Sequence, residues 1–198
     1  MSFDLPALPR ESDIDFLEIR AGGDLEGPLN GATIRINRLG DKTGVRVSLP
    51  TLKRGGAGDA WVAALLRGKL EPARLALPLP DGGVGDPGTP LVDGDGQAGA
   101  VLNLKGLTPG YVVGAGQAFS VIQDSVRYLH FATAAATADG SGDVSVSLAP
   151  MLRMSPADGA VVELAGPKIE GWIRKDEAGW SQAWTGIVTT GFTLIEAR

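Results

Sequence analysis

The chain has no cysteine and little aromatic content. The absence of cysteine excludes disulfide bonds, thiolate nucleophiles, iron–sulfur clusters and cysteine-bound zinc. Aromatic residues make up 6% of the chain, so we expect a thin core of aliphatic side chains. The single histidine, His130, is the simplest base for a serine or threonine nucleophile.

The sequence also lacks the segments that direct a chain to a membrane or bind it to nucleic acid. Its first 16 residues hold no apolar run of roughly 7 to 15 residues, the core of a signal peptide. No stretch approaches the roughly 18 uncharged apolar residues of a membrane-spanning helix. The net charge is −5, without a dense cluster of lysine and arginine. We therefore expect a soluble, unexported protein with no membrane anchor and no nucleic-acid partner.

Glycine and proline are abundant, with 29 and 13 residues in a chain of 198. The glycine content is about twice the average of roughly 7%. Hydrophobic residues still make up 43%, which argues against disorder. Glycine and proline scattered among runs containing valine, isoleucine and leucine are typical of short strands joined by turns. The composition therefore predicts a mainly β protein with one domain or two small ones.

The first 80 residues predict a sheet with one helix. Residues 1–12 contain two prolines and mixed charge, so we expect a loose arm that could grip a neighbouring subunit. Residues 13–21 predict a strand. Residues 32–38 and 45–49 each alternate apolar and polar side chains, and the turn residues in 39–44 favour a hairpin between them.

The predicted helix runs from Gly58 or Asp59 to about Arg67. Asp59 suits its N-terminus, and Gly68 suits its C-terminal stop. One apolar stripe, at helical spacing, consists of Trp61, Ala64 and Leu65. Such a stripe is suited to packing across a sheet. Residues 74–79 then predict a strand.

Residues 81–99 are rich in glycine and aspartate and predict a long linker that contains a domain boundary. Beyond it, six short strands are predicted at residues 101–104, 111–113, 118–122, 126–134, 144–148 and 160–164. Their close spacing suggests a small, OB-like barrel. Residues 169–174 and 183–197 add strands that should rejoin the first sheet. We expect a β-sandwich-like body at 1–80 and 170–198, with its helix near 58–68, and an inserted barrel at 90–168.

Residues 138–163 carry the strongest local signals. Asp139–Gly142 are small turn residues that tolerate positive φ angles, which favours a β-hairpin. After the turn, apolar residues alternate with polar ones, at Val144, Val146 and Leu148. We expect Pro150 to end this strand, because proline cannot donate a hydrogen bond to a ladder.

Four patterns were weighed as sites of chemistry. The aspartates of the glycine-rich segment offer oxygen ligands for a cation, but they lack calcium-loop spacing, so a solvated loop is preferred. They are Asp81, Asp86, Asp93 and Asp95. His130 is interpreted as structural, because no G-x-S-x-G motif frames a serine. Asp13, Asp15 and Glu18 are interpreted as a solvated strand face and not as a glycosidase pair. Residues 94–99 lack the Lys-Ser/Thr and the helix of a phosphate loop.

The sequence therefore predicts no catalytic, cofactor-binding or metal-binding residue, and no enzyme activity. Four tryptophans leave two alternatives open, core packing with partial exposure or a surface that stacks sugars or contacts a subunit. They are Trp61, Trp172, Trp180 and Trp184.

From about residue 59 to 198 the chain carries short patterns in a fixed order. They are WVAALLRG (61–68) followed by LALPL (75–79), then PLVDGDGQAG (90–99), GAGQAFS (114–120), ADGSG (138–142) with PMLRMSPADG (150–159), and FTLIE (192–196). In this order they resemble the distal tail proteins of tailed bacteriophages and of related prophage and gene-transfer particles. Gln117 stands where the third pattern usually has an acid. The first 55 residues match only in outline.

This resemblance implies a structural virion protein of the tail tip, assembled in the cytoplasm of the bacterial host. Such proteins form a homo-oligomeric ring, usually hexameric, which joins the tail tube protein to the baseplate hub proteins. The resemblance implies no catalytic residue. The alternative is a carbohydrate-binding host-recognition module of the tail tip with a glycan partner. A cell-wall hydrolase is disfavoured, because the sequence frames no nucleophile, metal site or carboxylate pair.

Overall fold

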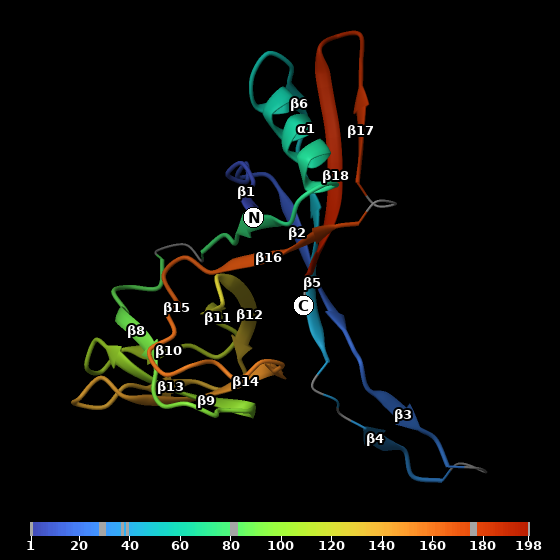
Figure 1. Cartoon of the computed structure of the whole chain (residues 1–198). Helices are drawn as coiled ribbons and strands as arrows, with labels where there is room; N and C mark the ends of the chain where they lie inside the picture. The colour runs from blue at the N-terminus through green and yellow to red at the C-terminus, as the bar shows by residue number, and fades with distance from the viewer. Residues whose placement is uncertain are drawn as a thin grey trace.

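The computed structural model describes residues 2–27, 31–36, 38, 40–79, 83–174 and 178–197. It confirms a mainly β chain with a sandwich-like body, a helix and a small barrel (Figure 1). Buried apolar side chains form two clusters. One lies between the helix and the larger sheet, and the other fills the barrel.

The larger sheet has eight strands. Its main path runs β1 (Phe3–Asp4), β7 (Ala73–Ala76), β16 (Lys168–Ile173), β18 (Ile187–Glu196), β5 (Lys42–Ser48) and β2 (Asp13–Ile19). Two more strands, β17 (Gly179–Gln182) and β6 (Leu52–Lys53), also pair with β18. The pairing of β18 with β5 confirms that the C-terminal tail rejoins the first sheet. The strands that flank the barrel in sequence, β7 and β16, are neighbours here.

Helix α1 (Ala57–Gly68) confirms the predicted helix and its apolar stripe, whose three residues are buried. The Trp61 ring lies 5.7 Å from the Phe192 ring of β18. Gly68 is the last helical residue, and its role is close packing. A Cβ atom there would come within 2.3 Å of the Ile173 Cδ1 atom of β16. Glycine therefore lets the helix end approach the sheet.

The predicted hairpin between residues 32–38 and 45–49 is wrong. Strand β4 (Ile34–Ile36) pairs instead with β3 (Gly23–Leu25), and β5 lies between β2 and β18. Strands β2 and β5 lie at the edge of the larger sheet, and β3 and β4 form a separate two-stranded sheet beyond them. We call these four strands the ribbon; its β3–β4 end extends away from the rest of the chain (Figure 1). The reason is burial: both runs alternate, but Val47 is fully buried by long-range pairing while Ile34 is 64% exposed.

The N-terminal arm is held by the body and is not loose. Strand β1 pairs in parallel with β7, and Leu5 is buried in the body core. The Arg67 guanidinium lies 4.3 Å from the centre of the Phe3 ring. Two apolar side chains and a sheet edge therefore fix a segment whose prolines had suggested freedom.

The smaller sheet has six strands and closes almost into a barrel. Its order is β15 (Val162–Glu163), β11 (Ala118–Gln123), β12 (Val126–Ala132), β14 (Val144–Leu152), β9 (Gly99–Leu107) and β8 (Gly88–Val92). A bridge between Leu91 and Val161 links its two ends. A separate pair is formed by β10 (Val112–Val113) and β13 (Ala136–Thr137).

Strand β8 corrects the prediction that residues 81–99 build no packed element. Glycine and aspartate set that prediction, but Val92 is fully buried in the barrel core. Pairing with β9 stabilises a strand whose local composition does not favour one. The early part of the segment, residues 81 and 82, lies outside the described residues.

The turn at Asp139–Gly142 is confirmed, but its flanking strands do not pair with each other. The Asp139 carboxylate accepts hydrogen bonds from the backbone N–H groups of Ser141 (2.8 Å) and Asp143 (3.0 Å). Strand β13 pairs with β10, whereas β14 pairs with β9 and β12. The alternation in β14 is confirmed, because its apolar residues face the barrel core.

The expectation that Pro150 ends this strand is wrong, since β14 continues to Leu152. The pairing of β14 with β9 shifts register between Ser147 and Leu152. Pro150 falls inside this irregular stretch, where a regular ladder does not require its missing N–H group.

Candidate interaction surfaces

Two clusters of charged side chains connect the larger sheet to the barrel. The first, which we call the inner joint, centres on Glu196 near the end of β18. Its carboxylate accepts backbone hydrogen bonds from Thr43 (2.8 Å) on β5 and Leu129 (2.7 Å) on β12. It also lies 2.8 Å from the Nη2 atom of Arg153, just after β14. One carboxylate therefore connects β18 and β5 of the larger sheet with β12 and with the residue that follows β14.

The inner joint is deeply buried. The Arg153 and Glu196 side chains are 6% and 1% exposed. Burial raises the pKa of Glu196, and the Arg153 charge and the two backbone donors oppose this rise. Within the described part of the chain, the Arg153 Nε and Nη1 atoms are buried without a hydrogen-bond partner. The Tyr128 ring lies 5.3 Å from this guanidinium. Arg153 and Glu196 therefore form a close ion pair, but the guanidinium makes fewer hydrogen bonds than it can donate.

The second cluster, the outer joint, centres on Arg127 of β12. Its guanidinium binds Glu163 of β15 through two hydrogen bonds of 2.9 and 3.0 Å. The hydrogen bond to Glu163 is the main cause of a raised Arg127 pKa. Arg127 also lies 3.7 Å from Glu170 of β16, which Arg74 of β7 contacts at 3.1 Å. The outer joint therefore links barrel and body through a chain of alternating charges.

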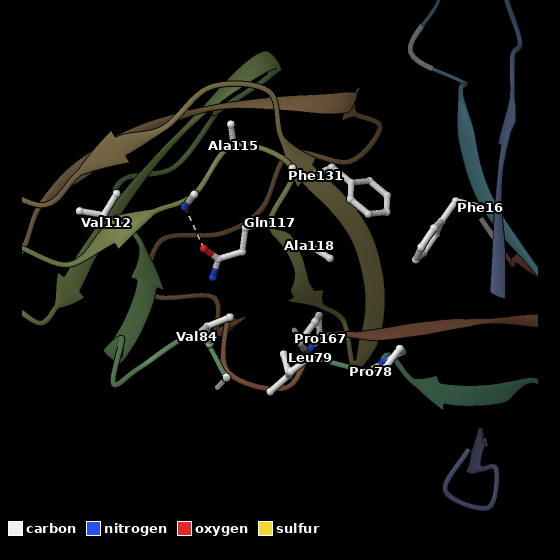
Figure 2. A pocket seen from close by; sticks show the side chains of 13 residues that line it. Phe16, Pro78, Leu79, Val84, Val112, Ala115, Gln117, Ala118, Phe131 and Pro167 are labelled. Atoms are coloured by element: carbon white, nitrogen blue, oxygen red, sulfur yellow. Dashed lines mark hydrogen bonds between the residues drawn. The ribbon is translucent and has the colours of Figure 1, made fainter. Parts of the chain in front are cut away.

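An apolar hollow of about 550 Å³ lies between the ribbon and the barrel (Figure 2). Its walls include Phe16 of β2 and Phe131 of β12, whose rings meet edge to face at 5.1 Å. Gln117 projects into it, yet its amide bonds the Gly114 N–H group (2.9 Å) and the Tyr111 hydroxyl (3.1 Å). Gln117, singled out by the family pattern, thus shapes a loop of the barrel.

A second hollow, the tryptophan groove, has a volume of about 590 Å³ and includes charged side chains in its lining. Trp172 lies on its surface with 45% of its side chain area exposed. Its lining consists of Ser2, Pro72, Arg74, Asp124, Ser125, Val126, Glu170, Trp172 and Ala197. It therefore joins both ends of the described chain to the β11–β12 turn of the barrel.

The four tryptophans have different environments. Trp61 is core, as one of the two alternatives expects. Trp180 of β17 is exposed beside the Lys69 ammonium, 5.7 Å from the ring centre. Trp184 is fully exposed in the connection between β17 and β18. Only Trp172 lines one of the hollows described above.

The end of the ribbon presents an exposed apolar surface, the ribbon face, made of Leu25, Ile34 and Ile36. Leu25 and Ile34 are directly opposite each other, and Ile36 is two residues further along β4, so all three share one side. On β4, Arg35 alternates with them and pairs with Asp24 at 3.0 Å. The ribbon is therefore amphipathic, with its apolar side open to solvent.

His130, the candidate base, is almost fully buried on β12. Its Nδ1 atom lies 2.8 Å from the Pro150 carbonyl oxygen, and its ring lies 5.9 Å from Phe119. Burial lowers its pKa to about 4. A neutral, enclosed imidazole bonded to a carbonyl group packs the core and has no open path to a substrate.

The acidic candidates bond to the protein itself. Asp95 accepts the Asp158 N–H group at 2.6 Å, and Asp86 accepts the Gly88 N–H group at 3.0 Å. Lys105 lies 3.5 Å from Asp93 and 2.6 Å from Asp158, and its hydrogen bond lowers the pKa of Asp158. Asp81 lies outside the described residues. Across the described ranges, no group of three acidic or histidine side chains is arranged to hold a metal ion.

The remaining candidates are equally local. Asp13, Asp15 and Glu18 are all exposed on β2, but the two aspartates lie on one side of the strand and Glu18 lies on the other. In residues 94–99, the Gln97 amide bonds the Asn103 backbone in both directions, at 2.7 and 3.2 Å, and so closes the β8–β9 turn. Sequence reasoning missed both joints. Their only local signal is a charged residue inside an apolar strand run, such as Arg127 or Glu170.

Comparison with protein-family models gives no match, and comparison with curated protein sequences gives no significant match. Among the described residues, no helix combines the length and apolarity that crossing a membrane requires.

Proposed function

We propose that this protein is a structural subunit of the distal end of a phage-type tail. In this role it forms a homo-oligomeric ring, expected to be hexameric, that joins the tail tube to the baseplate hub of a virion. The order of sequence patterns from residue 59 to 198 motivates this identity. The exposed ribbon face is the single structural observation that carries the oligomeric part of the proposal.

The ribbon face favours assembly because a two-stranded ribbon alone is marginal in water. Three large aliphatic side chains on its open side gain free energy when a second surface covers them, at roughly 25 cal/mol per Å² of apolar area. The ribbon extends from one side of the subunit only (Figure 1). It therefore suits a head-to-tail contact, the kind of interface that closes into a ring when the rotation per subunit is right.

The two joints also suit a ring subunit. A ring closes only if every subunit presents its two interfaces at the same angle. The inner and outer joints lie next to each other: Arg127 and Leu129 are two residues apart on β12, and Gly171, beside Glu170, pairs with Glu196. Together they hold the barrel to the body along one seam.

The proposal is tested by the mass of the full-length protein in solution, measured by native mass spectrometry and light scattering. We expect a hexamer for the natural sequence and a shift to monomer for Ile34→Asp, which places a charge in the ribbon face. Val101→Asp is the matched control, because Val101 is a similarly exposed apolar residue on barrel strand β9. It should keep the hexamer.

A natural chain that stays monomeric at every concentration would contradict the proposal. Retention of the ring by Ile34→Asp would show that the ribbon is not the contact. Deleting residues 2–5 is a poor test, because β1 belongs to the sheet and Leu5 to the core.

A further inference from the structure

We propose that the tryptophan groove is a carbohydrate-binding site, in which one pyranose ring lies on the Trp172 indole and its hydroxyl groups meet the surrounding polar side chains. This proposal does not depend on the assembly of subunits into an oligomeric ring. It rests on the arrangement of two walls, one from the larger sheet and one from the barrel.

The floor of the groove is one face of the larger sheet. Glu170 and Trp172 are two residues apart on β16 and therefore point to the same side. Arg74 is the direct partner of Glu170 on β7, and Pro72, just before β7, also lines the groove. Ile169 and Ile173 point to the opposite side, into the core beneath helix α1. The exposed Trp172 and the largely buried Arg74–Glu170 pair thus lie on the same face of the sheet.

The charged pair on this floor is held in place before any ligand arrives. The Arg74 Nε atom donates to Glu170, its Nη2 atom contacts the Ser2 hydroxyl, and Arg127 approaches the same carboxylate. The Glu170 side chain is almost fully buried, so these contacts restrict its rotation. Fixed polar groups reduce the entropy cost of binding.

The wall is the two-residue turn between β11 and β12. Asp124 and Ser125 have φ angles of 51° and 63°, in the left-handed region that glycine and asparagine prefer. Both side chains are exposed, and both residues line the groove. An Asn-Gly sequence would suit this turn better. The chain instead places a carboxylate and a hydroxyl group in the lining of the groove that contains the indole.

This lining fits a sugar better than a protein partner. The buried centre of a protein interface is depleted in charged residues, whereas here Arg74, Glu170 and Asp124 line the same hollow as Trp172. A sugar has hydroxyl groups that both donate and accept, and an apolar ring face that can cover an indole. The volume of about 590 Å³ lies in the usual range for small-ligand pockets. Two carboxylates disfavour a phosphate-bearing ligand.

The test uses the full-length protein and a panel of methyl pyranosides and oligosaccharides built from glucose, galactose, mannose, rhamnose and N-acetylglucosamine. Binding is measured by saturation-transfer NMR and titration calorimetry up to millimolar sugar. We expect at least one probe to bind, and Trp172→Ala to weaken it about tenfold or more. Trp172→Phe should recover part of this loss, because a smaller aromatic face remains.

The matched control is Trp184→Ala, since Trp184 is also exposed but lies outside the groove. It should leave sugar affinity unchanged. Both variants replace surface side chains, and circular dichroism checks that each is folded. A panel with no binder, binding that survives Trp172→Ala, or a Trp172 that is covered by a protein neighbour in assembled particles would each overturn the proposal.

Discussion

The inner and outer joints both link the barrel to the body, but the inner joint is more deeply buried. At the inner joint, Arg153 and Glu196 are almost wholly removed from water, and the guanidinium keeps two nitrogen atoms without partners among the described residues. At the outer joint, Arg127 and Glu163 keep 14% and 20% of their side chain area exposed. Each carboxylate of the outer joint also has a second partner: Ser120 for Glu163 and Arg74 for Glu170.

This difference predicts how each joint fails. A carboxylate that loses its cation in the interior keeps a charge with little solvent to stabilise it. At the outer joint, Glu163 would retain the Ser120 hydroxyl (2.8 Å) and Glu170 would retain Arg74 (3.1 Å). These remaining partners and the partial exposure to water should reduce the stability that is lost when the outer joint is broken. The inner joint should therefore dominate the stability of the connection.

The largest effect is expected for Arg153→Met, which leaves Glu196 buried without its cation. Breaking such a pair costs about 3–5 kcal/mol, so the free energy of unfolding in urea should fall by this order. The pKa of Glu196 is raised already, and removal of Arg153 raises it further. Because a raised carboxyl pKa favours the folded state only at low pH, the loss should be greater at pH 8 than at pH 5.

The double variant Arg153→Met with Glu196→Gln is the control for this experiment. It removes both charges, and buried pairs replaced together often cost little. It should be more stable than the single Arg153→Met variant, although the Thr43 and Leu129 N–H groups then meet a neutral amide oxygen. A double variant less stable than the single one would show that the charge is not the cause.

The next effect concerns His130, beside Leu129 on β12. In the folded chain its pKa of about 4 lies below the ordinary value of 6.5, because burial disfavours the charged ring. The unfolded chain therefore binds a proton more readily, and acidification from pH 6.5 to pH 4 removes stability. A shift of this size corresponds to about 3 kcal/mol. The stability contributed by a neutral His130 is fully present only above pH 6.5.

The measurement is the free energy of unfolding of the natural chain and of His130→Leu across this pH range. The variant should be less stable near neutral pH, since it loses the bond to the Pro150 carbonyl oxygen, but its stability should fall less on acidification. Glu196→Gln checks the opposing contribution, because a raised carboxyl pKa makes stability rise as pH falls. Parallel curves for the natural chain and His130→Leu would contradict the buried neutral state.

The sequence predicts what local periodicity determines. The Trp61 stripe marks the helix, and the alternation from Val144 to Leu148 marks the inward side of β14, because both signals arise within a few residues. Strand partners depend instead on burial by distant segments, which is why Ile34 was paired with the wrong strand. The same applies to β8, where the Val92 position in the barrel core outweighs glycine and aspartate nearby.

The joints and the groove could not be predicted for a related reason. Glu196 binds residues 43, 129 and 153, and no local spacing brings these positions together. The sequence offers Trp172 as a candidate for a sugar-stacking or subunit-contact surface, but nothing in its local sequence distinguishes it from the other three tryptophans. Its distinction comes from Arg74 and the Asp124–Ser125 turn, which reach it only through the topology.

The smallest of these effects is expected for Arg127→Ala, which breaks the outer joint. Hydrogen bonds to charged groups contribute about 1.5–3 kcal/mol, and partial exposure places this loss near the lower end. We expect about 2 kcal/mol in urea unfolding, clearly less than for Arg153→Met. Lys168→Ala is the control, because Lys168 forms a single exposed contact with Asp4 at 3.5 Å and should change stability by less than about 0.5 kcal/mol.

The ranking of the two arginine variants decides whether burial sets the strength of the connection. If Arg127→Ala costs as much as Arg153→Met, the redundancy of Glu163 and Glu170 does not protect the outer joint, and its charges act as one coupled network. Adding Glu163→Gln to Arg127→Ala separates these cases. When Glu163 is the only partner that matters, the second change costs little more, whereas a coupled network should lose further stability as Glu170 and Arg74 rearrange.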